Sequence, residues 1–160
     1  MKKFKKLLAM GLAVMASVSA MSISAMAKEV ITYDNGVVMT IYESAEEFDR
    51  VLPRTVDMTF STTLTTSLKY LRSLETSSYI MTLSGDETEV VVVYDQAPSG
   101  VMLYTTLYDV TTGRYLIDDD GPSYQSYAVT YSNLPKAHKY QLGYRTAYGT
   151  VDVSGSVNSY

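Results

Sequence analysis

The residues from Thr55 to Leu64 alternate between a set that suits a protein core and a set that suits water. The first set is mostly apolar and the second is wholly polar, which is the period of a β-strand with one buried face. Similar segments, separated by turn residues at intervals of about 8 to 12 positions, fill most of the chain after residue 28. The sequence therefore predicts an all-β fold, an antiparallel sandwich of about nine strands.

Asn35-Gly36 joins the first two of these segments, within residues 29–42. An Asn-Gly pair supplies the two positive φ angles of a type I′ turn, so we expect a hairpin with a two-residue loop. Pairing across that loop gives the hairpin an apolar face. The residues predicted on this face are Val30, Val37, Met39 and Ile41.

One short helix is expected near the N-terminus of the domain. Ser44 and Glu47 have the spacing of a capping box, Phe48 begins an apolar helical pattern, and Pro53 ends it. Residues 66–75 are predicted as a strand because Thr and Ser surround their leucines, although the leucine spacing fits a helix equally well.

Residues 78–95 predict a second hairpin around a loop at 84–87. The unbroken apolar run from Val90 to Tyr94 is typical of a strand that is buried on both faces. We therefore expect this strand to be central in its sheet.

Residues 1–27 have the pattern of a cleaved export signal. A lysine-rich start is followed by an apolar stretch and by Ala25-Met26-Ala27, a small-x-small cleavage site. An uncleaved membrane anchor is the alternative, because the apolar stretch is nearly long enough to span a bilayer. Cleavage predicts a secreted, extracellular protein with one domain at 28–160 and no membrane span. A lysine-rich signal on a chain without Cys resembles those of proteins secreted by Gram-positive bacteria.

The charge of the exported chain argues against two classes of partner. Four of the 13 Lys and Arg residues lie in the signal, whereas all 17 Asp and Glu residues follow it, so the chain from Lys28 has a formal charge of −8. A surface of this sign repels phosphate backbones and anionic lipid headgroups. We expect neither nucleic acid nor a membrane surface to be a partner.

The C-terminal stretch YQSYAVTYSNLPKAHKYQLGY, at 124–144, is followed by Gly149 and the segment VDVSGSV. An alternating strand, a short Asn-Leu-Pro turn and a strand ending in Tyr resemble the closing strands of small secreted bacterial jelly-roll sandwiches. The pre-peptidase C-terminal domain and carbohydrate-binding-like modules have this pattern. The resemblance implies a jelly-roll-like fold and an accessory or binding role, and it carries no functional residue over.

An acidic loop is predicted at Asp118, Asp119 and Asp120, which precede Gly121. Clustered carboxylates on a turn can bind Ca²⁺ through oxygen ligands, and such a site would steady the fold. The run lacks the alternating spacing of an EF-hand loop, so a solvated turn is the alternative. No other cofactor is expected.

Fifteen tyrosines, in a chain without Trp, offer rings that can stack on sugars or anchor a protein interface. Most are expected in the core, where Tyr suits strand positions. Tyr124, Tyr127 and Tyr131 lie on both faces of one predicted strand, so some of them should be exposed. These three are the candidates for a contact surface.

Catalysis has little support in the sequence. The chain has no Cys nucleophile and no G-x-S-x-G or H-E-x-x-H motif, and its single histidine, His138, lies in a predicted turn. The sequence therefore predicts a non-enzymatic module that binds an extracellular glycan or protein. The alternatives are a small hydrolase that uses an Asp/Glu pair and a structural or inhibitory module steadied by calcium.

Overall fold

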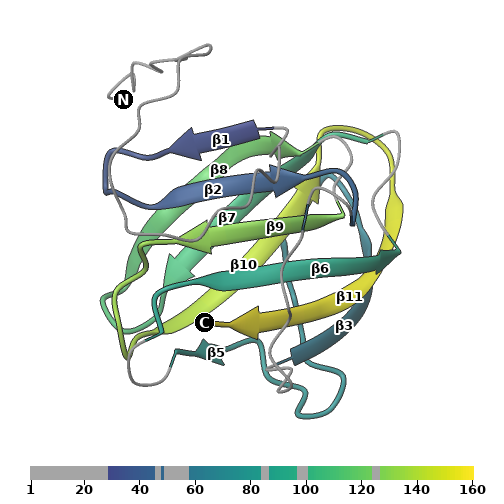
Figure 1. Ribbon diagram of the computed structural model, residues 1–160. Helices are drawn as coiled ribbons and strands as arrows, with labels where there is room; N and C mark the ends of the chain where they lie inside the picture. The colour runs from purple at the N-terminus through teal and green to yellow at the C-terminus, as the bar shows by residue number, and fades with distance from the viewer. Residues whose placement is uncertain (1–28, 46–47, 49–57, 84–86, 97–100, 124–126) are drawn as a thin grey trace.

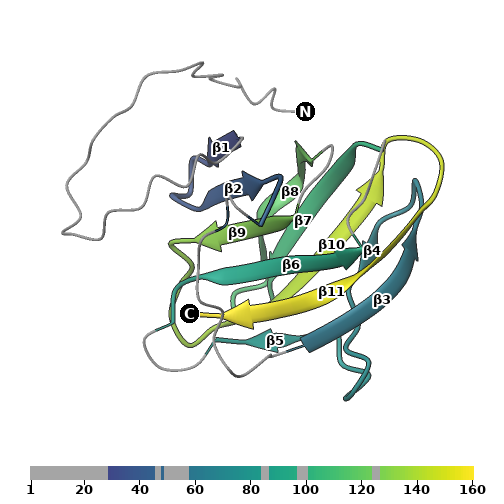
Figure 2. The same ribbon diagram turned by 45° about the vertical axis from the view of Figure 1, so that its right-hand side comes forward.

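The computed structural model describes residues 29–45, 48, 58–83, 87–96, 101–123 and 127–160. All regular secondary structure in this part is β and forms two antiparallel sheets, one behind the other (Figures 1 and 2). The all-β antiparallel prediction is confirmed. Eleven strands lie in the described residues, where about nine were predicted. The same residues include no helix long and apolar enough for a membrane crossing.

The first sheet has six strands, and Figure 1 shows it in front. Their order across the sheet, with bounds, is β1 (Glu29–Thr32), β2 (Val38–Tyr42), β9 (Ala128–Ser132), β6 (Val90–Gln96), β11 (Val151–Ser159) and β3 (Met58–Leu64).

The second sheet has five strands. Two short strands, β4 (Lys69–Tyr70) and β5 (Met81–Thr82), both pair with β10 (Lys139–Thr146) along one edge of this sheet. The path is β4, β10, β7 (Leu103–Asp109) and β8 (Arg114–Ser123). The segment between β4 and β5 leaves this edge and reaches the backbone of β3 in the other sheet, where Leu74 N donates to Thr59 O at 2.9 Å. That crossing connects the two layers along one side.

The core lies between the sheets and takes side chains from both. β6 lies between β9 and β11, as the apolar run predicted. Val92 and Tyr94 face the other sheet, whereas Val91 and Val93 pack with Phe48 on the opposite face. Both faces of β6 are thus buried, which explains why the sequence of this strand does not alternate.

The first hairpin forms, but with a different loop. Asp34, Asn35 and Gly36 make a three-residue loop, because only Gly36 has a positive φ, at 86°, and a type I′ turn needs two. The longer loop slips the register by one residue, and a one-residue slip moves a side chain to the other face. Ile31 therefore packs against the core and Val30 is 59% exposed, so the prediction that placed Val30 on the core face was wrong.

Two further predictions differ from the structure. The segments at 78–83 and 89–95 do not form a hairpin, because β5 pairs with β10 in one sheet while β6 lies in the other. Of residues 66–75 only β4 is a strand, and the rest is loop. The predicted helix falls mostly outside the described residues. Within them, Phe48 N donates to Ser44 O at 3.2 Å.

Candidate functional site

Tyr131 does not belong to a contact surface. It is fully buried in β9, and its hydroxyl lies 2.8 Å from that of Tyr144. The prediction was wrong for this residue because its side chain faces the opposite sheet and not solvent. Tyr127 is half-buried, and its ring lies 6.3 Å from the ring of Phe48. Tyr124 lies outside the described residues.

The three consecutive aspartates lie within strand β8 and not in a loop. A register shift against β7 between Thr105 and Leu107 and a positive φ of 51° at Asp119 interrupt the strand here, so alternation does not decide where the three side chains point. Asp119 instead forms a bidentate pair with Arg145, whose Nε and Nη2 donate to its two oxygens at 2.5 and 2.6 Å. No three Asp, Glu or His side chains gather as a metal-ligating group anywhere in the part of the chain described here.

His138 holds a turn together. Its Nδ1 lies 2.8 Å from Oδ2 of Asp109, a carboxylate that is only 1% exposed. Asp109 also accepts hydrogen bonds from the backbone of Thr111 and from the backbone and hydroxyl of Thr112. Burial disfavours ionisation of Asp109, but the hydrogen bonds from Thr112 and His138 outweigh it and lower the pKa of the carboxyl. The cluster fixes the turn between β7 and β8.

The outward face of the five-stranded sheet carries a group of tyrosines that the sequence analysis did not single out. In β7, Leu103 and Leu107 point inward, so the alternation of the strand turns Tyr104 and Tyr108 outward. Tyr108 pairs across the sheet with Tyr115 of β8, and their rings lie 4.9 Å apart. Tyr115 is 53% exposed.

A glycine makes room for a fourth ring. Tyr70 of β4 lies opposite Gly143 of β10, and a Cβ on Gly143 would be only 3.0 Å from the Tyr70 ring and 2.9 Å from Leu68. Burial and then the hydroxyl of Tyr115 raise the pKa of Tyr70. Thr106 faces outward beside Gly143 and is nevertheless 1% exposed. We call Tyr70, Tyr104, Tyr108 and Tyr115 the tyrosine face.

Polar groups lie beside the tyrosine face at both ends of β7. The guanidinium of Arg145 lies 4.2 Å from the centre of the Tyr104 ring, within cation–π range, and is held there by Asp119. Gln141 lies opposite Tyr108 on the neighbouring strand. The face therefore presents aromatic rings together with fixed hydrogen-bonding groups.

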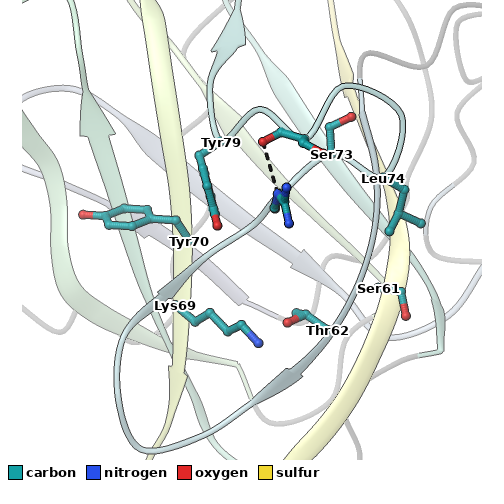
Figure 3. Close-up of a pocket in the computed structure, with 9 residues that line it drawn as sticks. Ser61, Thr62, Lys69, Tyr70, Ser73, Leu74 and Tyr79 are labelled. Atoms are coloured by element: carbon teal, nitrogen blue, oxygen red, sulfur yellow. Dashed lines mark hydrogen bonds between the residues drawn. The ribbon is translucent and has the colours of Figure 1, made fainter.

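A pocket of about 310 Å³ opens where the 69–79 segment crosses to β3 (Figure 3). Its lining residues combine two cations, two tyrosines and several hydroxyls. They are Ser61, Thr62, Lys69, Tyr70, Arg72, Ser73, Leu74, Ser77 and Tyr79. Figure 3 shows the Lys69 side chain extending from β4 toward the space between these lining residues. Tyr70 belongs both to the pocket and to the tyrosine face, so the two features adjoin at this residue.

Comparison of this chain with protein-family models, with curated proteins and with solved structures finds no match.

The tyrosine face had a signal in the sequence. Within residues 101–109, Tyr104, Thr106 and Tyr108 occupy the alternate positions between the leucines, as in a β-strand. Asking which set of each strand faces water would have found them. The pocket had no such signal, because it depends on a crossing between sheets that no local pattern encodes.

Proposed function

We propose that this protein is a secreted, non-enzymatic β-sandwich module that binds an extracellular glycan through the tyrosine face. The observation that carries the proposal is the gathering of Tyr70, Tyr104, Tyr108 and Tyr115 on the outward face of one sheet. Tyrosine rings offer flat apolar surface with a polar hydroxyl at the edge. A sugar ring has the matching chemistry, with C–H groups on its faces and hydroxyls around them.

Preorganisation supports a binding role. The rings are held by strands and by one another, so binding orders few side chains, which is the main cost of recognition at such a surface. Arg145 and Asp119 are already paired, so each keeps its orientation without a ligand. The jelly-roll-like description belongs to the same proposal and rests on the two antiparallel sheets.

The test is retention of the purified protein on isolated cell wall, mucin, plant polysaccharides and extracellular-matrix proteins. We expect saturable binding to a polysaccharide that Tyr108→Ala or Tyr115→Ala weakens by about tenfold, since a stacked aromatic side chain contributes about 1 kcal/mol or more. Tyr148→Ala is the matched control, because Tyr148 is 61% exposed in the turn after β10. Binding that all three variants leave unchanged would contradict the proposed site.

The same samples test the non-enzymatic part of the proposal. Each polysaccharide is incubated with the protein and assayed for new reducing ends. We expect none to appear. Release of sugars that a carboxylate substitution abolishes would instead support a hydrolase with an Asp/Glu pair. If the protein were retained on an extracellular-matrix protein and on no polysaccharide, the partner would be a protein and not a glycan.

A further inference from the structure

We infer that the pocket beside the tyrosine face binds a carboxylated sugar residue. The inference rests on the proposed function, since it names the class of glycan. Tyr70 connects the two features, because the residue borders the pocket while its ring extends away from the pocket, beside Gly143 on the tyrosine face (Figure 3). A glycan that lies on the tyrosine face and extends past Tyr70 therefore reaches the pocket with its next residue.

The pocket is already built in the structure. Ser73 N donates to Ser78 O at 2.8 Å, and the Ser73 hydroxyl accepts from the backbone of Glu75 and Thr76. The Glu75 carboxylate in turn accepts from the hydroxyl and the backbone of Thr59 on β3. These bonds fasten the loop to the sheet, so a ligand meets formed walls.

One wall of the pocket is the free edge of β3. Thr59 O accepts from Leu74 N and Thr63 O accepts from Lys69 Nζ, so the backbone groups of these alternate residues face away from β11. Alternation along a strand gives the backbone of Ser61, midway between them, the same direction. Ser61 is exposed and lines the pocket, so its N–H and C=O are available to a sugar hydroxyl.

The charges in the pocket select an anion. Lys69 and Arg72 are the charged residues among the described lining residues, in a chain whose formal net charge is −4. Arg72 Nε donates to Ser77 O at 3.2 Å, drawn as the dashed line in Figure 3, which leaves its Nη groups for a ligand. A guanidinium binds a carboxylate through two parallel hydrogen bonds. The nearest acid in the loop, Glu75, is engaged by Thr59 and Ser73.

The size and polarity of the pocket favour one sugar unit over an acidic peptide. About 310 Å³ is at the small end of ligand sites. Leu74 is the only aliphatic residue in the described part of the lining and is 61% exposed, so this part of the lining forms no apolar hole for a peptide side chain. Tyr79, which is 46% exposed, and the hydroxyl of Thr62 match the face and the hydroxyls of a sugar ring.

The experiment is a nuclear magnetic resonance titration of the full chain with sodium glucuronate. The amides of Ser61, Arg72 and Ser77 report on the pocket, and those of Thr106 and Tyr115 report on the tyrosine face. Glucose, sodium acetate, sodium sulfate and N-acetylglutamate are titrated in parallel. We expect glucuronate at millimolar concentration to shift the pocket amides in a saturable way, and about tenfold more tightly than any of the other four.

Charge-removing variants give the second measurement. Arg72→Gln and Lys69→Gln should each weaken glucuronate binding by about tenfold, since each removes one charged hydrogen-bond donor. Arg114→Gln removes the same charge from an exposed residue outside the pocket and should have no effect. Loss of binding in this control as well would show only a general attraction for anions and would overturn the inference.

The two groups of amides separate the possible failures. Pocket amides that do not respond to glucuronate, or respond equally to acetate, sulfate or N-acetylglutamate, overturn the carboxylated sugar while leaving the tyrosine face to be tested with polysaccharides. Pocket shifts that persist in Tyr108→Ala and Tyr115→Ala, when these variants leave polysaccharide retention intact, support the pocket and contradict the proposed role of the face.

Discussion

The hydroxyl of Tyr131 and the hydroxyl of Tyr144 lie 2.8 Å apart in the centre of the core. Tyr131 belongs to the six-stranded sheet and Tyr144 to the five-stranded one, so this hydrogen bond joins the two layers. Both side chains are at most 1% exposed. The ring of Tyr94 lies 6.4 Å from that of Tyr144, so three tyrosines lie together in the buried core.

Removing either hydroxyl of this bond should destabilise the protein. Tyr131→Phe or Tyr144→Phe leaves the other hydroxyl buried with one partner fewer, and we expect each to cost about 1–3 kcal/mol of unfolding free energy. The double variant should cost less than the sum, because it removes both ends of the bond. Urea denaturation measures all three, with Tyr148→Phe as the exposed control. Additive single costs would show that the two hydroxyls do not interact.

The buried tyrosines also predict a loss of stability in alkali. Burial, and in Tyr131 and Tyr144 the neighbouring tyrosines, raise the pKa of Tyr94, Tyr131 and Tyr144 above the ordinary value near 10. Above about pH 10 the unfolded chain releases protons that the folded chain retains, so unfolding free energy should fall as the pH rises, with no effect of these groups below that pH. Urea midpoints and tyrosinate absorbance follow the two events. Equal midpoints up to about pH 11 would contradict the predicted retention of these protons.

Local sequence patterns correctly predicted features that depend only on neighbouring residues, such as the burial of a strand and the position of a loop. The apolar run at Val90–Tyr94 specifies burial on both faces, and β6 is indeed central. The loop at Asn35-Gly36 was located correctly but its length was not, because the same dipeptide serves a two-residue and a three-residue loop. Which strands pair across the chain, such as β5 with β10, depends on long-range packing that the sequence does not display.

The candidate site shows the same division. Tyr131 was predicted as a contact residue and is buried, whereas Tyr108 was not predicted and is half-buried on the outward face of β7. β9 is covered on both faces, whereas the outer face of β7 is half-exposed at Tyr104 and Tyr108, and only the topology decides this difference. The aspartates of β8 were predicted in a loop because acidic runs favour turns. Pairing with β7 and the Asp119–Arg145 ion pair hold them in a strand.

Asp109 should make the protein sensitive to acid. Its pKa is lowered in the folded state, so its stabilising effect is present above the unfolded value near 4 and is lost as the pH falls below it. Asp109→Asn should cost about 1.5–3 kcal/mol at neutral pH and make the unfolding free energy less dependent on pH between about 2 and 5. Asp118→Asn, at an exposed position of β8, is the control. If the unfolding free energy of Asp109→Asn depended on pH as strongly as that of the unsubstituted protein, Asp109 would not be the cause of the acid sensitivity.

Calcium should not change the stability of this protein. The two oxygens of Asp119 already accept from Arg145, and no three acidic side chains gather as a metal-ligating group among the described residues. We expect the same thermal midpoint in calcium chloride and in a chelator, since only a ligand of the native state raises it. A midpoint that rises with calcium in the native protein but not in Asp119→Asn would establish a site at β8.

Gly155 should be among the least replaceable residues of the sheet. It lies where the register between β6 and β11 shifts, and a Cβ there would be 2.1 Å from the carbonyl oxygen of Val93 and 3.0 Å from Cα of Tyr94. Both atoms are backbone in the central strand, so they cannot move aside as a side chain could. Gly155→Ala should cost about 3 kcal/mol or more and reduce the soluble yield.

Gly149→Ala is the control that separates this clash from backbone strain. Gly149 has a φ of 68° with nothing within 4 Å of a Cβ, so alanine there meets only the cost of a left-handed conformation, about 1–2 kcal/mol. Urea denaturation ranks the two variants. If the two variants instead had equal unfolding free energies, β6 and β11 could move apart at the register shift without a loss of stability. The close approach of their backbones would then not stabilise the sheet.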